Sequence, residues 1–105
     1  MKLAVDCRSI DEIRDCIDEV DYQILAAFGQ RLEYVKEIVK FKNDAEGILA
    51  RDRQLEVFHK RREWAQEFGL NPDLFEEIYK LLVTWNVQKE LEIFRNNEKE
   101  NSNQI

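Results

Sequence analysis

Apolar residues recur along the first third of the chain in steps of mostly three or four positions, which is the period of an amphipathic helix. A capping-box pattern precedes them, in which Ser9 and Glu12 can each satisfy a free backbone donor of the first turn. The pattern predicts one helix from about residue 10 to about 43, roughly 50 Å long. The apolar series consists of Ile13, Ile17, Val20, Ile24, Phe28, Val35 and Ile38.

Two further helices are predicted after a loop over residues 43–47. The second runs from about residue 51 to 67 and is stopped by Gly69. The third begins at Asn71-Pro72-Asp73, which supplies an N-cap, a proline at the first helical position and an acid in the first turn, and it ends near residue 96. The residues expected to be buried are Leu55, Phe58, Trp64, Ala65, Leu74, Ile78, Leu82 and Trp85, with Val83, Val87 and Phe94 on an adjoining stripe.

These patterns predict an all-α fold of three helices, with one helical domain over residues 6–96 and a disordered tail over residues 97–105. A compact chain of this size has a radius of gyration of about 13 Å, so the long first helix must project beyond a single-chain core. The projecting apolar residues need cover. An intertwined or coiled homodimer would provide it.

Composition and charge exclude several classes of protein. Hydrophobic residues make up 44% of the chain and charged residues 36%, with one proline and three glycines, which is typical of a soluble helical protein. The net charge of −6 argues against nucleic-acid binding, although a local basic pocket could still bind a small anion. The sequence contains neither a membrane span nor the apolar core of a signal peptide, so we expect a cytoplasmic protein without membrane attachment.

The sequence offers no metal site and no pair of nucleophile and base. Cys7 and Cys16 match neither a metal-ligand spacing nor a redox pair, and both are expected to be reduced thiols without a chemical role. His59 is the only histidine and lies in a charged run, where we expect it to be solvated. Without a second histidine or a suitable cysteine, neither metal binding nor nucleophilic catalysis is predicted.

Cations that interrupt apolar stripes are candidates for function. Arg31 lies at a position of the first helix where the pattern predicts an apolar residue. A lone arginine there could also pack its aliphatic part on the core and leave its guanidinium group in water. Lys42 follows almost three helical turns later, so both would project from nearly the same side about 16 Å apart and could bracket a small dianion. Arg53, just beyond the predicted loop, could fold back over the same pocket.

Arg14 and Glu90 complete the set of candidates. Arg14 lies about 25 Å from Arg31 along the helix, so one chain cannot bring both to one small ligand. In an antiparallel dimer it could reach the partner's pocket, and the alternative is a weak ion pair with Asp18. Glu90 lies within an apolar stripe, where burial would raise its pKa and a nearby arginine would lower it. The alternative for Glu90 is an edge position facing solvent.

Together, these residues resemble the all-helical chorismate mutases, and most closely their isochorismate pyruvate-lyase branch, known from bacterial salicylate and siderophore pathways. The resemblance covers about residues 6–95. An Ile-Arg-x-x-Ile-Asp-x-x-Asp opening over residues 13–21 is similar to a family-wide motif, and Tyr-Val-Lys with Phe-Lys points to the lyase branch. The matching segments are DEIRDCIDEVD (11–21), RLEYVKEIVKFK (31–42), Arg53, REWAQEFGL (62–70) and TWNVQKEL (84–91).

The resemblance implies an intertwined homodimer with two equivalent sites, each built from both chains and binding a small dicarboxylate, isochorismate or chorismate. The partner subunit's Arg14, together with Arg31 and Arg53, would bind the substrate carboxylates. Lys42 would contact a carboxylate and the ether oxygen and would close the site with its mobile loop. Ile38 and Val87 would form the apolar wall against the ring.

The implied catalytic residues are Lys42, Glu90 and Arg31. Both reactions pass through cyclic transition states that need no enzyme nucleophile, and no cofactor is expected; positioning of the substrate and cations at the ether oxygen can then provide catalysis. Glu90 departs from the lyase branch, which has glutamine there, and a glutamate can replace the amide donor only when protonated.

Three functions remain open at this point. The resemblance favours a lyase of salicylate biosynthesis, isochorismate to salicylate plus pyruvate, and does not separate it from a chorismate mutase of aromatic amino-acid biosynthesis. An alternative of another class is a non-enzymatic helical dimerisation module whose cations are solvated. The sequence also does not assign Tyr34, which either lines the site or packs beside it.

Overall fold

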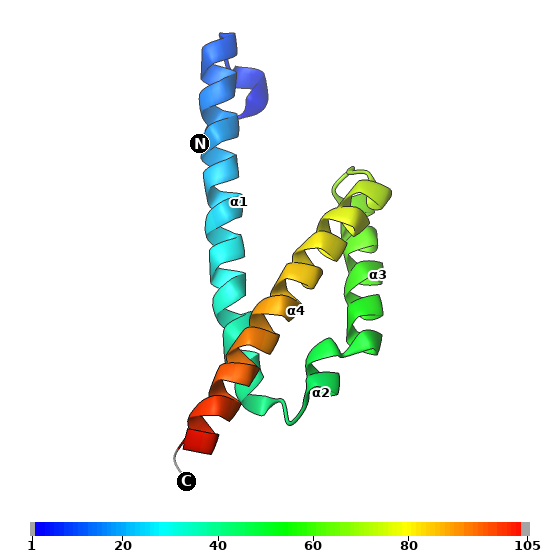
Figure 1. Cartoon of the computed structure of the whole chain (residues 1–105). Coiled ribbons are helices and arrows are strands. Elements are labelled where there is room, and N and C mark those ends of the chain that lie inside the picture. The colour runs from blue at the N-terminus through cyan, green and yellow to red at the C-terminus, as the bar shows by residue number, and fades with distance from the viewer. Residues whose placement is uncertain (1, 104–105) are drawn as a thin grey trace. The chain divides into compact units, whose positions relative to one another are not determined.

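The computed structural model describes residues 2–103, the last three by their backbone alone. The described residues contain no β-strand, which confirms the predicted all-α class. None of the described helices is long and apolar enough to cross a membrane. The chain divides into two compact units, Met1–Tyr34 and Val35–Ile105. In order, the elements are η1 (Ala4–Asp6), α1 (Ile10–Ile38), η2 (Val39–Phe41), α2 (Ala45–Leu49), α3 (Arg51–Glu67) and α4 (Pro72–Asn103) (Figure 1).

The first unit contains most of α1 and a short N-terminal segment, residues 2–8, which we call the hook. The hook folds back beside the first turns of α1 (Figure 1). The predicted cap of α1 is present, because the Glu12 N–H donates to Ser9 Oγ at 3.1 Å. The Glu12 carboxylate holds the hook: it accepts the Arg8 N–H at 2.7 Å and pairs with Lys2 Nζ at 3.1 Å. These contacts lower the pKa of Glu12, with the Arg8 hydrogen bond as the largest cause. The carboxylate that fastens the hook is therefore ionised at neutral pH.

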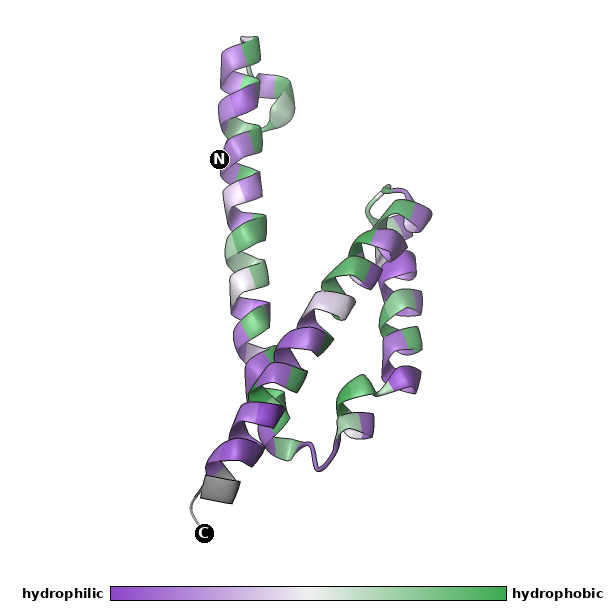
Figure 2. Cartoon of the chain, viewed as in Figure 1, coloured by the Kyte–Doolittle hydropathy of each residue, from purple (hydrophilic) through white to green (hydrophobic). Residues whose placement is uncertain are grey.

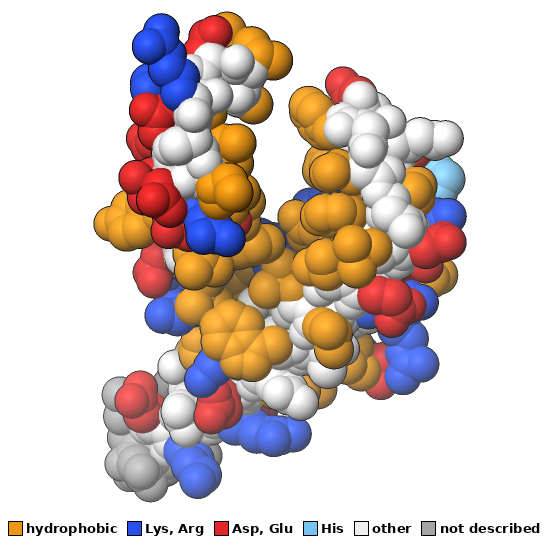
Figure 3. Space-filling model, turned by 90° about the horizontal axis from the view of Figure 1, so that it is seen from above, with side chains coloured by type: hydrophobic (Ala, Val, Ile, Leu, Met, Phe, Trp, Pro, Cys, Tyr) orange, Lys and Arg blue, Asp and Glu red, His pale blue; other side chains and the backbone are white. Residues whose placement is uncertain are grey.

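The apolar stripe of α1 has no cover within the first unit. No described side chain of α1 is buried. Four members of the predicted stripe, Ile13, Ile17, Val20 and Ile24, are between 40% and 53% exposed. Apolar and polar positions alternate along α1 in Figure 2, and the apolar side chains gather on one side of it in Figure 3. An exposed stripe of this length is typical of an interaction surface.

The second unit begins with the end of α1, which differs from the prediction. The helix stops at Ile38 instead of near residue 43, and η2 follows as a tighter last turn, as is common at helix ends. Lys42 then adopts an extended backbone with φ −99° and ψ 132°. The predicted three-turn spacing from Arg31 to Lys42 assumed a continuous α-helix and is wrong for that reason.

Residues 43–47, predicted as a loop, contain the start of the short helix α2. Asp44 caps this helix by accepting the Gly47 N–H at 2.8 Å. Ala50 separates α2 from α3 with a positive φ of 40°, a left-handed conformation that a non-glycine residue adopts only at a cost. This residue turns the chain from the segment that follows Lys42 into α3.

The remaining predicted boundaries are confirmed at three of four positions. α3 spans Arg51–Glu67 and stops at Gly69, whose φ is 72°. Asn71 caps α4 by accepting the Asp73 N–H at 2.9 Å. α4 continues to Asn103, past the predicted end near residue 96, because no glycine or proline follows Pro72. Residues 104 and 105 of the predicted disordered tail lie outside the described residues.

The core of the second unit forms where α4 contacts α3, α2 and η2. Burial is confirmed for Ala65 and Val83, but Leu55, Trp64, Leu74 and Trp85 are exposed, contrary to prediction. A two-helix hairpin can cover only one face of each helix, and here the covered face of α3 is that of Val57 and Ala65. The buried residues of the described chain are Val39, Ile48, Val57, Ala65, Val83, Asn86 and Glu90.

Candidate active site

Lys42 is fixed by the turn that follows it. Its side chain is half-buried, and Nζ donates to the Gly47 carbonyl oxygen at 2.7 Å. Asp44 accepts the N–H of the same glycine, so both peptide groups of Gly47 are engaged. A Cβ added at Gly47 would lie 3.3 Å from Asp44 Oδ1 and 3.7 Å from Lys42 Cδ. An ammonium group has three donors, so this anchor leaves two for a ligand.

Glu90 is a buried acid on α4, only 8% exposed, so the alternative of a solvent-facing edge residue is wrong. The helix that carries it contacts η2 and α2, the elements directly before and after Lys42. Within the second unit, α4 therefore packs on the segment from which the Lys42 ammonium projects. Val87, the predicted apolar wall, is half-buried on the same helix.

Asn86 is a candidate that the sequence analysis did not identify. It is 4% exposed and lies one helical turn before Glu90, so the two polar side chains share a face of α4. A signal for it was present in the sequence: Asn86 is a polar residue one position before Val87, within the apolar stripe that contains Glu90. The amide offers both a donor and an acceptor beside the buried carboxyl group.

Arg53 and Ile38 lie at more open positions of the second unit. Arg53 is exposed and pairs with Glu56 on its own helix, with Nη1 2.8 Å from Oε1. A surface ion pair of this kind contributes about 0–1 kcal/mol, so a ligand dianion can compete for the guanidinium. Ile38, the last residue of α1, is 45% exposed. The structure thus places neither residue in a closed pocket.

Arg14 and Arg31 lie in the first unit, on one unbroken helix. Arg14 is exposed and Arg31 is half-buried. Seventeen positions on a continuous helix separate them by about 25 Å, which is far more than a small dicarboxylate spans. The geometry of α1 therefore bears out the prediction that one chain cannot bring both arginines to one ligand.

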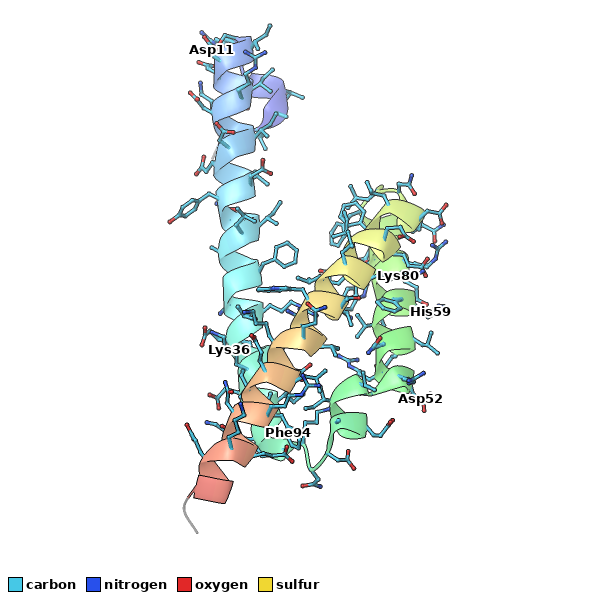
Figure 4. The ribbon with its side chains drawn as sticks, in the orientation of Figure 1. Asp11, Lys36, Asp52, His59, Lys80 and Phe94 are labelled. Atoms are coloured by element: carbon cyan, nitrogen blue, oxygen red, sulfur yellow. The ribbon has the colours of Figure 1, made fainter. Side chains whose placement is uncertain are left out.

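Several other titratable and aromatic side chains of α3 have partners within the α3–α4 hairpin. His59 is exposed, as predicted, with Nε2 3.0 Å from Glu63 Oε1. Figure 4 shows it on α3, with Lys80 and Phe94 on α4. The Arg61 guanidinium lies over the rings of Trp64 and Tyr79, 4.7 and 5.3 Å from their centroids. The contact of Arg61 with Tyr79 joins α3 to α4 and stabilises their hairpin.

Comparison with known proteins shows the family of this chain. The family model for chorismate mutase type II matches residues 13–91. An isochorismate pyruvate lyase from Pseudomonas aeruginosa is 32% identical over 95 residues, which is 90% of this chain and 94% of the relative. Two T-proteins are also similar: that of Haemophilus influenzae is 30% identical over 67% of this chain, and that of Enterobacter agglomerans 33% identical over 68%. The chain spans 19% of each T-protein.

The chain is thus an all-helical protein with arginines on α1, a lysine fixed by its own turn and a buried acid on α4, and a protein of this class can bind small carboxylates through its cations. Within that class, this chain belongs to the chorismate mutase type II family. It is an enzyme of this type, so the alternative of a non-enzymatic dimerisation module is excluded.

Proposed function

We propose that this enzyme is an isochorismate pyruvate lyase, which converts isochorismate to salicylate and pyruvate and also rearranges chorismate to prephenate. The observation that carries the proposal is the extent of the similarity to the Pseudomonas lyase, which covers 90% of this chain and nearly the whole relative. The T-protein matches cover only about two thirds of the chain. The chain thus shares with the lyase a stretch that it does not share with the T-proteins.

The proposed reaction needs a charged, preorganised pocket and no covalent intermediate. The ether C–O bond of isochorismate breaks while a ring hydrogen passes to the methylene carbon of the enolpyruvyl group, so every atom of the substrate appears in salicylate or pyruvate. Negative charge develops on the ether oxygen as the bond breaks. A fixed cation at that oxygen stabilises the transition state more than the ground state.

Lys42 supplies this cation in the proposal. The bond to the Gly47 carbonyl fixes Nζ, and its two remaining N–H groups can donate to the ether oxygen and to one substrate carboxylate. Arg31 and Arg53 bind the carboxylates, for which Arg53 must leave the exposed pair with Glu56. Ile38 and Val87 face the ring, and Asn86 adds a polar contact next to Glu90.

The proposal requires a homodimer in which the partner subunit's Arg14 completes each site. Its support is the uncovered stripe of α1, which a second copy of the same helix would bury. Arg14 is exposed on its own chain and is therefore available to the partner.

Incubation of the enzyme with each substrate tests the proposed activity. We expect isochorismate to yield salicylate, followed by its fluorescence, with kcat/KM at least about tenfold above that for prephenate formation from chorismate. Chorismate and isochorismate carry the same dicarboxylate ether and differ in the position of a hydroxyl group, so both are expected to bind. Prephenate as the only product would contradict the lyase proposal and favour the mutase, for which the similarity to the T-proteins provides the support.

Glu90 is proposed to donate a hydrogen bond to the ether oxygen from its protonated carboxyl group. Its burial disfavours the charged form, and the protonated form alone has a donor. We expect kcat/KM to fall about tenfold per pH unit once Glu90 loses its proton, because the deprotonated enzyme lacks this donor. Glu90→Gln carries a donor at every pH, so its profile should be flat from about pH 5 to 8.

The matched control for this profile is Glu92→Gln. Glu92 is exposed on the same helix and pairs with Lys89, with 3.4 Å between Oε2 and Nζ, so its change removes the same charge away from the site. This control should keep the wild-type profile. A wild-type rate that is flat over the same pH range, and unchanged by Glu90→Gln, would rule out the proposed proton.

A further inference from the structure

The side chains of Cys7 and Cys16 meet where the hook folds back on α1. The Cys7 Sγ donates to the Leu3 carbonyl oxygen at 3.8 Å, and the Cys7 thiol is near enough to Cys16 to raise the pKa of the Cys16 thiol. Both cysteines are half-buried and reduced. Their spacing in the sequence did not predict this proximity, because it depends on the hook returning along the helix.

Glu12 accounts for the alignment of the two thiols. It holds the hook through the Arg8 N–H, and Arg8 directly follows Cys7. Cys16 lies four residues after Glu12, one turn further along the same face of α1. The carboxylate therefore places the hook's thiol over the face of α1 that carries Cys16.

The thiol pair lies beside the apolar stripe of α1 and not within it. At about 100° per residue, Cys16 is rotated by about 70° from the centre of the stripe formed by residues 13, 17, 20 and 24. Arg14 is rotated by about 90° in the opposite direction. A second copy packed on the stripe would therefore leave the side of α1 that carries the hook and the thiol pair accessible. Arg14 lies on the opposite side of the stripe, so the hook does not cover it.

A reagent can approach Cys7 from an open depression beside the hook. Cys7 lines this depression of about 640 Å³ together with Lys2, Val5, Asp6, Arg8 and Glu12. Cys16 is not among these lining residues. Burial and the neighbouring Cys7 thiol raise the pKa of the Cys16 thiol, so Cys16 stays protonated at neutral pH.

We propose that Cys7 and Cys16 form a dithiol site that a small disulfide such as oxidised glutathione converts reversibly into an intramolecular disulfide. This site is separate from the proposed active site and does not depend on its substrate. The Cys7 thiolate attacks one sulfur of the oxidised glutathione, forming a mixed disulfide and releasing one glutathione thiolate. Cys16 then loses its proton to solvent, and its thiolate attacks the Cys7 sulfur and releases the second glutathione. Two protein thiols are oxidised and one disulfide is reduced to two thiols.

The test is the equilibrium of the native enzyme with mixtures of reduced and oxidised glutathione, quenched with acid and read by intact mass. We expect the intramolecular disulfide as the main oxidised species, with an effective thiol concentration at least about tenfold above that of the same protein in denaturant, because the folded hook aligns the sulfurs. The rate of closure should rise with pH as Cys16 deprotonates. Mixed disulfides as the main product, or an effective concentration no higher than in denaturant, would overturn the proposal.

Two acid-to-amide variants test whether the hook aligns the thiols of Cys7 and Cys16. Glu12→Gln removes the charge that fastens the hook and is expected to lower the effective concentration severalfold in the native enzyme. Asp15→Asn removes one charge from an exposed position of the same helix and should leave it unchanged. Equal values for wild type and Glu12→Gln would show that the hook does not align the thiols, and would overturn the proposed geometry.

Discussion

Lys42→Met is expected to lower kcat/KM for isochorismate by about 10³, which corresponds to about 4 kcal/mol of transition-state stabilisation. Methionine keeps the apolar stem and removes the ammonium group, whose charge is proposed to stabilise the ether oxygen as its bond breaks. The loss should appear mainly in kcat, because the charge on that oxygen develops only in the transition state. Steady-state salicylate formation measures it.

Lys40→Met is the matched control for this variant. Lys40 lies two residues earlier, is exposed, and pairs with Glu37 with 2.6 Å between Nζ and Oε2. The same change there should alter kcat/KM less than about threefold, and both variants should keep the wild-type helical circular dichroism. Lys42→Met as active as Lys40→Met would remove Lys42 from the proposed mechanism.

Local signals in the sequence predicted the helices well because each depends on neighbouring residues only. Ser9 and Asn71 act as caps and Gly69 as a stop, each through contacts within four residues. The end of α1 was not predicted, because η2 and the Lys42–Gly47 bond arise from the packing of the following turn against α4. A continuous helical period cannot show where such packing interrupts the helix.

Burial was predicted less well because apolar periodicity identifies each apolar face of a helix but does not show what packs against that face. The contact can come from the same chain or from another chain. The stripe of α1 and the exposed Trp85 satisfy the pattern and still lie in solvent in the single chain. The burial of Glu90 was left open for a related reason. Its position in the stripe allowed either a buried site or a solvent-facing edge, and only contact with other elements decides between the two. The proximity of Cys7 and Cys16 likewise follows from a tertiary contact of the hook.

Subunit mixing should test the proposed division of the site between two chains of a homodimer. Homodimers of Arg14→Ala and of Lys42→Met are each expected to lose at least about 99% of the activity, because every site lacks one cation. A heterodimer of the two variants, purified with two different affinity tags, should recover about half of the wild-type activity. One of its two sites then carries both defects and the other carries none, if Arg14 serves the partner's pocket as proposed.

The control heterodimer combines Arg31→Ala with Lys42→Met. Arg31 and Lys42 are proposed to serve the same chain's pocket, so each of its sites keeps one defect and no activity should return. An Arg14→Ala and Lys42→Met heterodimer as inactive as its parents would mean that Arg14 does not cross the interface. Because α1 holds Arg14 about 25 Å from Arg31 on one continuous helix, Arg14 would then have no route to the substrate, and its part in the site would be excluded.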